Sequence, residues 1–195
     1  MSPGEAPAPR FRGGGRLLRI SLGLAAAGAI LLLVGLFVAP RRVAFAYLTA
    51  YAYVVSIAVS GLLFLMICHA MGAVWPTVVR RLVEAMVKTL PLLGALFIPI
   101  LVGLPALYPW TRPGAAPDER ARRLLEHRLP YLNVPFFAIR TAIYFALWIG
   151  VGTLLCRWSE RRDHDPSRPV SGKLKSLSAG ALPLVGLAMA FASFD

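Results

Sequence analysis

Residues 43–71, VAFAYLTAYAYVVSIAVSGLLFLMICHAM, decide the fold class, because this stretch contains no Asp, Glu, Lys or Arg. A helix needs roughly 20 consecutive apolar residues to cross the hydrocarbon core of a bilayer, which is about 30 Å thick. Backbone amides cannot stay unpaired in lipid, so such a stretch is expected to be helical. The sequence therefore predicts a transmembrane helix from Val43 to Met71.

Four further stretches with little or no charge lie on either side of this one. We expect spans at about Arg16 to Ala39, Leu90 to Tyr108, Val134 to Cys156, and from Leu177 onward. The last stretch reaches Asp195 without a polar border, which is the pattern expected of part of a larger protein. Small residues at helical spacing, such as Ala142, Ala146 and Gly150, allow helix backbones to approach. The expected fold is all-α: a polytopic transmembrane helix bundle in residues 16–195, behind a disordered tail in residues 1–15.

The composition excludes a soluble globular protein. Hydrophobic residues make up 57% of the chain and charged residues 15%, against about 25% charged in an ordinary soluble domain. The net charge of +12 does not indicate nucleic-acid binding, because Lys and Arg lie between the apolar stretches, where they face lipid headgroups. Thirteen of these bases fall on the N-terminal side of the membrane and seven on the other side, which favours a cytoplasmic N-terminus.

Two connecting segments are expected to form short interfacial helices. In residues 75–88, one face of the helix is apolar, and Glu84 is spaced for ion pairs with Arg80 and Lys88. The apolar face consists of Val78, Val79, Leu82 and Met86. Residues 117–128 begin with acids and end with bases, as suits the helix dipole. We expect the first of these helices to lie in the membrane interface and to lead into the third span.

No residue pattern indicates a metal or haem site. Cys68 and Cys156 form no Cys-x-x-Cys motif and are interpreted as packing residues. A haem held between helices needs two axial ligands, and His69 is the single histidine close to a span. His69 is therefore an interfacial residue bonded to a loop, or a group for proton transfer or quinone contact.

Arg140 is the one charge inside a predicted span, and two interpretations stay open. Such a group marks a partner or a pathway by default, or it extends to the outer headgroups. One hypothesis pairs Arg140 with Asp195 in a polar cluster that includes Tyr144. The tyrosines of the second span, Tyr47, Tyr51 and Tyr53, are expected in an interfacial aromatic belt.

Short motifs recur in order from about residue 45 to the end of the chain. They are His69-Ala70, residues 75–81 (WPTVVRR) with Glu84, Leu90-Pro91, residues 108–110 (YPW), residues 130–137 (PYLNVPFF) with Arg140, Tyr144 to Trp148, and residues 191–195 (FASFD). This set resembles the F subunit of bacterial alternative complex III. That subunit belongs to the NrfD-like, polysulfide-reductase group of quinone-interacting membrane proteins, whose members carry about ten spans.

The resemblance implies that the chain is roughly the N-terminal half of a subunit of a quinol:cytochrome c oxidoreductase in the bacterial inner membrane. Its partners would be other membrane subunits and the subunits that carry the haem and iron–sulfur clusters, and this chain would bind no cofactor and would not be catalytic alone. Its expected role is to scaffold the membrane part, with a proton path or a quinone pocket. The resemblance suggests His69, Glu84, Arg140 and Asp195 for the path or pocket, and Arg80, Arg81 and Asn133 for shaping loops.

Alternatives to this assignment stay open. Glu84 could instead form a surface ion pair with Arg80. The third span contains Pro91, Pro99 and Pro105, and broken helices are characteristic of transporter binding sites, so a small transporter or channel is the second expectation. An enzyme acting alone in the membrane has no visible catalytic residues.

Overall fold

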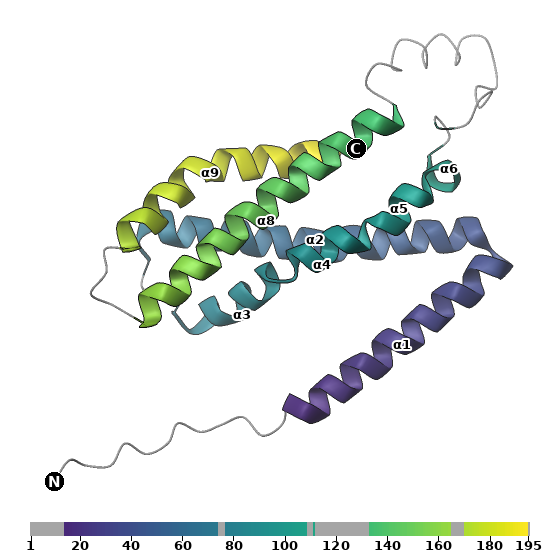
Figure 1. Ribbon diagram of the computed structural model, residues 1–195, viewed down its shortest axis with the longest axis horizontal. Helices are drawn as coiled ribbons and strands as arrows, with labels where there is room; N and C mark the ends of the chain where they lie inside the picture. The colour runs from purple at the N-terminus through teal and green to yellow at the C-terminus, as the bar shows by residue number, and fades with distance from the viewer. Residues whose placement is uncertain (1–13, 74–76, 109–110, 112–132, 165–169, 195) are drawn as a thin grey trace. The chain divides into compact units, whose positions relative to one another are not determined.

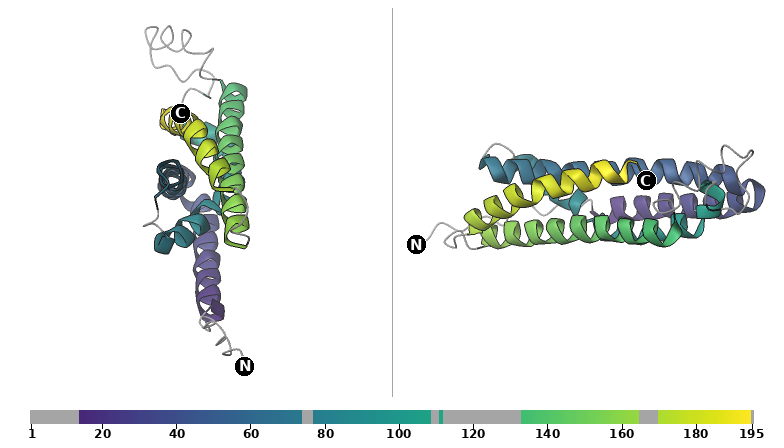
Figure 2. Two further views of the ribbon diagram at one scale, coloured as in Figure 1. Left: turned by 90° about the vertical axis from the view of Figure 1, so that its left-hand side faces the viewer. Right: turned by 90° about the horizontal axis from the view of Figure 1, so that it is seen from above.

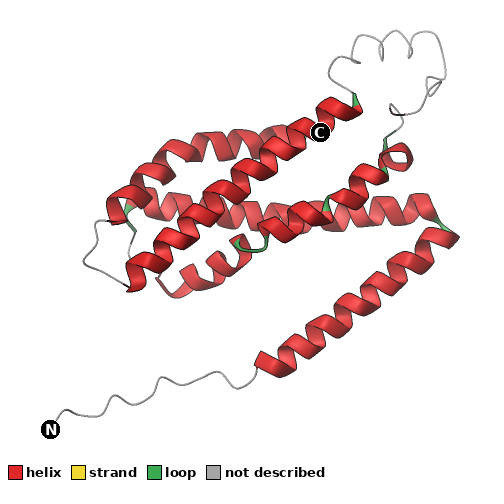
Figure 3. Ribbon diagram, in the orientation of Figure 1, coloured by secondary structure: helices red, strands yellow, loops and turns green. Residues whose placement is uncertain are grey.

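The computed structural model describes residues 14–73, 77–108, 111, 133–164 and 170–194. Regular structure within these ranges is helical, without strands (Figure 3). Five helical segments are long and apolar enough to cross a membrane: Gly14–Val38, Pro40–Met71, Val79–Val102, Val134–Arg162 and Ser171–Ala192. The prediction of an all-α polytopic transmembrane protein is confirmed. The second predicted interfacial helix, residues 117–128, lies outside the described residues.

The chain divides into two compact units, residues 1–43 and 44–195. The first unit contains helix α1 (Gly14–Val38), which begins two residues earlier than expected and has no buried side chain. Helix α2 (Pro40–Met71) follows after Ala39 alone, and Pro40 suits its first position because the missing N–H is not needed there. At this junction an added Cβ on Gly35 would lie 2.6 Å from Val43 Cγ2, so any larger residue at Gly35 would require Val43 to move.

The third predicted span is broken into short helices, as its prolines predict (Figure 1). Proline lacks a backbone N–H and clashes with the preceding turn, so a new helix starts at each one. Pro91, Pro99 and Pro105 each occupy the second position of a helix. The helices in this region are α3 (Thr77–Val87), α4 (Leu90–Leu96), α5 (Ile98–Val102) and α6 (Leu104–Leu107). The segment of membrane length, Val79–Val102, includes most of α3 and thus starts before the predicted Leu90.

Two tyrosines of α2 bind the backbone where α4 ends. The N–H of Phe97 donates three residues back, one short of its helical partner Leu93. The Leu93 carbonyl instead accepts the Tyr51 hydroxyl at 2.7 Å, and the Leu96 carbonyl accepts the Tyr47 hydroxyl at 2.6 Å. A carbonyl without a hydrogen bond in lipid costs on the order of several kcal/mol, because no water is present to donate one. Tyr47 and Tyr51 therefore bind the third span at its break. From the sequence, these two tyrosines were expected in an interfacial aromatic belt.

Helices α8 (Val134–His164) and α9 (Val170–Ala192) run side by side and pack against each other (Figure 2). Asn133 begins α8, because its side-chain Oδ1 accepts the N–H of Phe136 at 2.8 Å. That contact is an N-cap, which satisfies one of the donors exposed at a helix start. Asn133 therefore shapes this end of α8.

Close approaches between helices occur at glycines other than the small residues expected from spacing. An added Cβ on Gly152 would lie 2.8 Å from Val87 Cγ1, and one on Gly61 would lie 3.2 Å from Val83 Cγ1. Both contacts bring α3 close to its neighbours. Ala142 and Ala146 are exposed, so the prediction that they mediate packing within this bundle is wrong for the described residues.

Candidate functional site

Helix α3 turns its polar face toward the bundle. Glu84 is only 2% exposed and lies beside the buried side chains of Val83 and Val87. Three residues of the predicted apolar face are exposed on the outside of the bundle: Val79, Leu82 and Met86. In water this arrangement would be costly, but lipid covers apolar side chains as well as the protein interior does. The outward apolar face agrees with a helix in contact with lipid.

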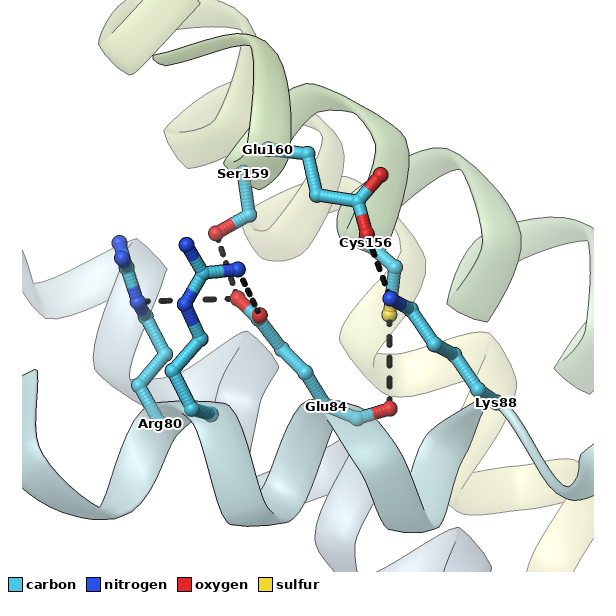
Figure 4. A network of polar contacts seen from close by, with 7 residues as sticks. Arg80, Glu84, Lys88, Cys156, Ser159 and Glu160 are labelled. Atoms are coloured by element: carbon cyan, nitrogen blue, oxygen red, sulfur yellow. Dashed lines mark hydrogen bonds and ion pairs between the residues drawn. The ribbon is translucent and has the colours of Figure 1, made fainter. Parts of the chain in front are cut away.

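The Glu84 carboxylate is the centre of a polar cluster between α3 and α8 (Figure 4). The hydroxyl of Ser159, itself 1% exposed, donates a hydrogen bond to Glu84 Oε1 at 2.5 Å. Arg80 Nε lies 3.6 Å from Oε1, and Arg81 Nη1 lies 3.5 Å from Oε2. The ion pair with Arg80 is present as expected, but its predicted place at the surface is wrong because the carboxylate is buried.

A second ion pair, closer to solvent, joins α8 to the turn that follows α3. Lys88 Nζ lies 2.5 Å from Glu160 Oε1, so Lys88 pairs across to α8 and not with Glu84. Both side chains are about half exposed, and such a pair contributes about 0–1 kcal/mol. The thiol of Cys156 is a weak donor to the Glu84 carbonyl at 3.9 Å. We call these residues the Glu84 cluster: Arg80, Arg81, Glu84, Lys88, Cys156, Ser159 and Glu160.

The structure brings two of the four predicted path residues together. His69 lies in the last turn of α2, within electrostatic reach of Arg162, Arg80 and Glu84. Arg80 and Arg81, for which loop shaping was expected, both lie on α3 and form ion pairs with Glu84. Asp195 lies outside the described residues, and so does its predicted pairing with Arg140.

Arg140 occupies a separate position on α8. It precedes Ser159 by 19 residues, which corresponds to about 28 Å of helix at 1.5 Å per residue. Its guanidinium carbon lies 4.6 Å from the centroid of the Phe136 ring, a cation–π contact. Arg140 is 9% exposed, so protein covers its side chain. This burial contradicts the interpretation in which the side chain extends to the outer headgroups. Arg140 and the Glu84 cluster are two distinct polar sites.

The sequence pattern did not predict the residues that α8 contributes to the Glu84 cluster. Ser159 and Glu160 stand at the end of a long apolar helix among Arg157, Arg161 and Arg162, where they resemble ordinary flanking residues. Glu160 was the one available indication, because an acid within a basic flank usually has a specific base to pair with.

The described residues contain no group of three or more His, Cys, Asp or Glu side chains that could hold a metal ion. The absence of a cofactor in the whole chain stays a prediction. The fold defines a multi-pass membrane protein. No protein-family model matches the chain, and a search of curated proteins finds no match. The resemblance to the F subunit of alternative complex III therefore also stays a prediction.

Proposed function

We propose that this chain is a cofactor-free integral membrane subunit of a respiratory quinol:cytochrome c oxidoreductase of the alternative complex III type. The observation that carries the proposal is the burial of Glu84 within a bundle of membrane-length helices. An ionisable group in that setting is costly and marks a partner or a pathway. The ordered motifs from His69 to the C-terminal FASFD segment support the same assignment.

In this proposal the Glu84 cluster is one end of a proton path. His69 titrates near neutral pH when unperturbed, a carboxylate can hold a proton, and the Ser159 hydroxyl can pass one on. With the N-terminus in the cytoplasm, α2 ends on the cytoplasmic side, so His69 and Glu84 would lie where protons enter. Arg140 would lie toward the opposite side, about 28 Å further along α8.

The second part of the proposed role is scaffolding. No side chain of α1 is buried, and α8 carries exposed apolar residues such as Ile139 and Ile143. Membrane lipids or other membrane subunits would cover these surfaces. The partner subunits would hold the haem and iron–sulfur clusters.

Purification of the full chain from its own membranes in mild detergent tests this assignment. We expect haem-containing partners to co-purify, together with quinol-dependent reduction of cytochrome c. A stable monomer without partners would contradict the proposal. Within an active complex, Glu84→Gln should lower the number of protons moved per electron, whereas Leu82→Ala on the outer face of α3 should leave it unchanged.

A small transporter or channel is the second candidate, and the breaks at Phe97 and Gly103 favour it. In transporters, carbonyls freed by such breaks coordinate ions. At the Phe97 break, the carbonyls of Leu93 and Leu96 already accept hydrogen bonds from tyrosine hydroxyls, which makes ion binding by these two carbonyls less favourable. Ion or solute flux through vesicles that contain this chain alone would decide in favour of the transporter.

A further inference from the structure

The outward face of α8 changes from apolar to basic at one position. Ile139, Ile143 and Leu154 are all at least 40% exposed, and they share one face of the helix, because steps of four and eleven residues correspond to about one and three helical turns. The same face continues with Arg157 and Arg161, which are also exposed. The apolar part extends over about 22 Å, and Arg157 lies only about 5 Å beyond Leu154.

Exposed bases also begin the neighbouring helix. Lys173 and Lys175 lie in the first turns of α9, which packs against α8 (Figure 1). Two described carboxylates near this end are already paired: Glu84 with Arg80 and Arg81 of α3, and Glu160 with Lys88 in the turn after α3. Within the described part of the chain, none of the four exposed bases of α8 and α9 forms an ion pair with a carboxylate. We call these four the basic rim: Arg157, Arg161, Lys173 and Lys175.

We propose that the basic rim binds the headgroup phosphates of anionic two-chain phospholipids, with the acyl chains along the outward face of α8. Arginine guanidinium groups match phosphate oxygens in a bidentate geometry, and the lysines add point charges. Such a lipid has apolar acyl chains that end in an anionic headgroup, so the chains match the apolar surface and the headgroup matches the positive charges. An acidic protein segment would match the charges but would leave the apolar face of α8 uncovered. This inference does not depend on the proposed respiratory function.

Binding of defined lipids to the purified full chain tests the proposal. The probes are phosphatidylglycerol and phosphatidylcholine with identical acyl chains, and native mass spectrometry measures how much of each stays bound. We expect a preference for phosphatidylglycerol. Each base near a membrane surface contributes about a fivefold change in affinity for anionic lipid. Replacing all four residues of the basic rim by glutamine should therefore reduce the preference at least about tenfold.

A matched variant separates a site from net charge. Replacing the exposed residues Arg16, Arg19, Arg41 and Arg42 by glutamine removes the same four charges from the first unit. We expect this variant to keep most of the preference. An equal loss in both variants would overturn the proposal, since overall charge would then explain it. If the rim variant keeps its lipid preference but loses an acidic protein that binds the unmodified chain, the proposal is also overturned.

The unmodified chain supplies a readout that does not depend on whether a variant folds. Salt screens exposed charges, with a Debye length of about 3 Å at about 1 M ionic strength. The preference for phosphatidylglycerol should therefore decrease severalfold between low salt and about 1 M salt. Lack of any preference at low salt, or a preference that salt leaves unchanged, contradicts binding at the basic rim.

Discussion

Replacing Glu84 by glutamine tests how far the packing of α3 depends on one buried charge. Glutamine keeps the length of the side chain and an acceptor for the Ser159 hydroxyl, so mainly the charge facing Arg80 and Arg81 is lost. Removing one partner of a buried ion pair costs about 3–5 kcal/mol, and of an exposed pair about 0–1 kcal/mol. The Arg80 side chain is 13% exposed. We therefore expect the free energy of unfolding to fall by about 2–3 kcal/mol, between the values for an exposed and a buried pair.

Double-mutant cycles on the purified chain separate the two arginines. Unfolding in mixed micelles by an added denaturing detergent, followed by tryptophan fluorescence, measures the free energy of each variant. The coupling energy between Arg80 and Glu84 should be about 1–2 kcal/mol, and that between Arg81 and Glu84 below about 0.5 kcal/mol, because the Arg81 side chain is 58% exposed. A larger coupling to Arg81 than to Arg80 would refute the reasoning.

Three further substitutions test the packing of the bundle, each measured as a free energy of unfolding in the same assay. Gly152→Ala places a methyl group 2.8 Å from the nearest side chain of α3 and should cost about 1–3 kcal/mol, whereas Gly150→Ala, with open space around it, should cost nothing. Tyr51→Phe removes the hydroxyl that satisfies a carbonyl of the broken span and should cost about 1–2 kcal/mol; Tyr53→Phe, at a 69% exposed position, should cost almost nothing. Asn133→Ala removes the N-cap of α8 and should cost about 1 kcal/mol. Equal costs within either matched pair, or no cost at Asn133, would contradict the contacts described.

The helical class and the number of spans were predictable because a long uncharged stretch has few stable forms in lipid. The breaks near Pro91, Pro99 and Pro105 were predictable for an equally local reason, the missing N–H of proline. These features depend on neighbours along the chain. The expected orientation, the family and the path residues involve other proteins or the membrane, and they stay predictions.

The inward face of α3 was not predictable from periodicity. The spacing of Val79, Leu82 and Met86 defines an apolar face, but lipid and protein interior satisfy such a face almost equally. The deciding contact is between Glu84 and Ser159, which are 75 positions apart. Long-range contacts also decide which small residues mediate packing. Gly152 and Ala146 are both small residues of α8, and only the position of α3 determines which of them must be small.

The separation between Glu84 and Ser159 has a consequence for synthesis of the chain. At about 5–20 residues per second, Glu84 is added to the chain roughly 4–15 s before Ser159. During that interval the carboxylate has no partner from α8. Arg80 and Arg81 are on the same helix, at spacings of four and three residues, so they can neutralise Glu84 as soon as α3 forms. The two arginines thus let the carboxylate enter the membrane region with its counter-ions already in place, and α8 then completes the site.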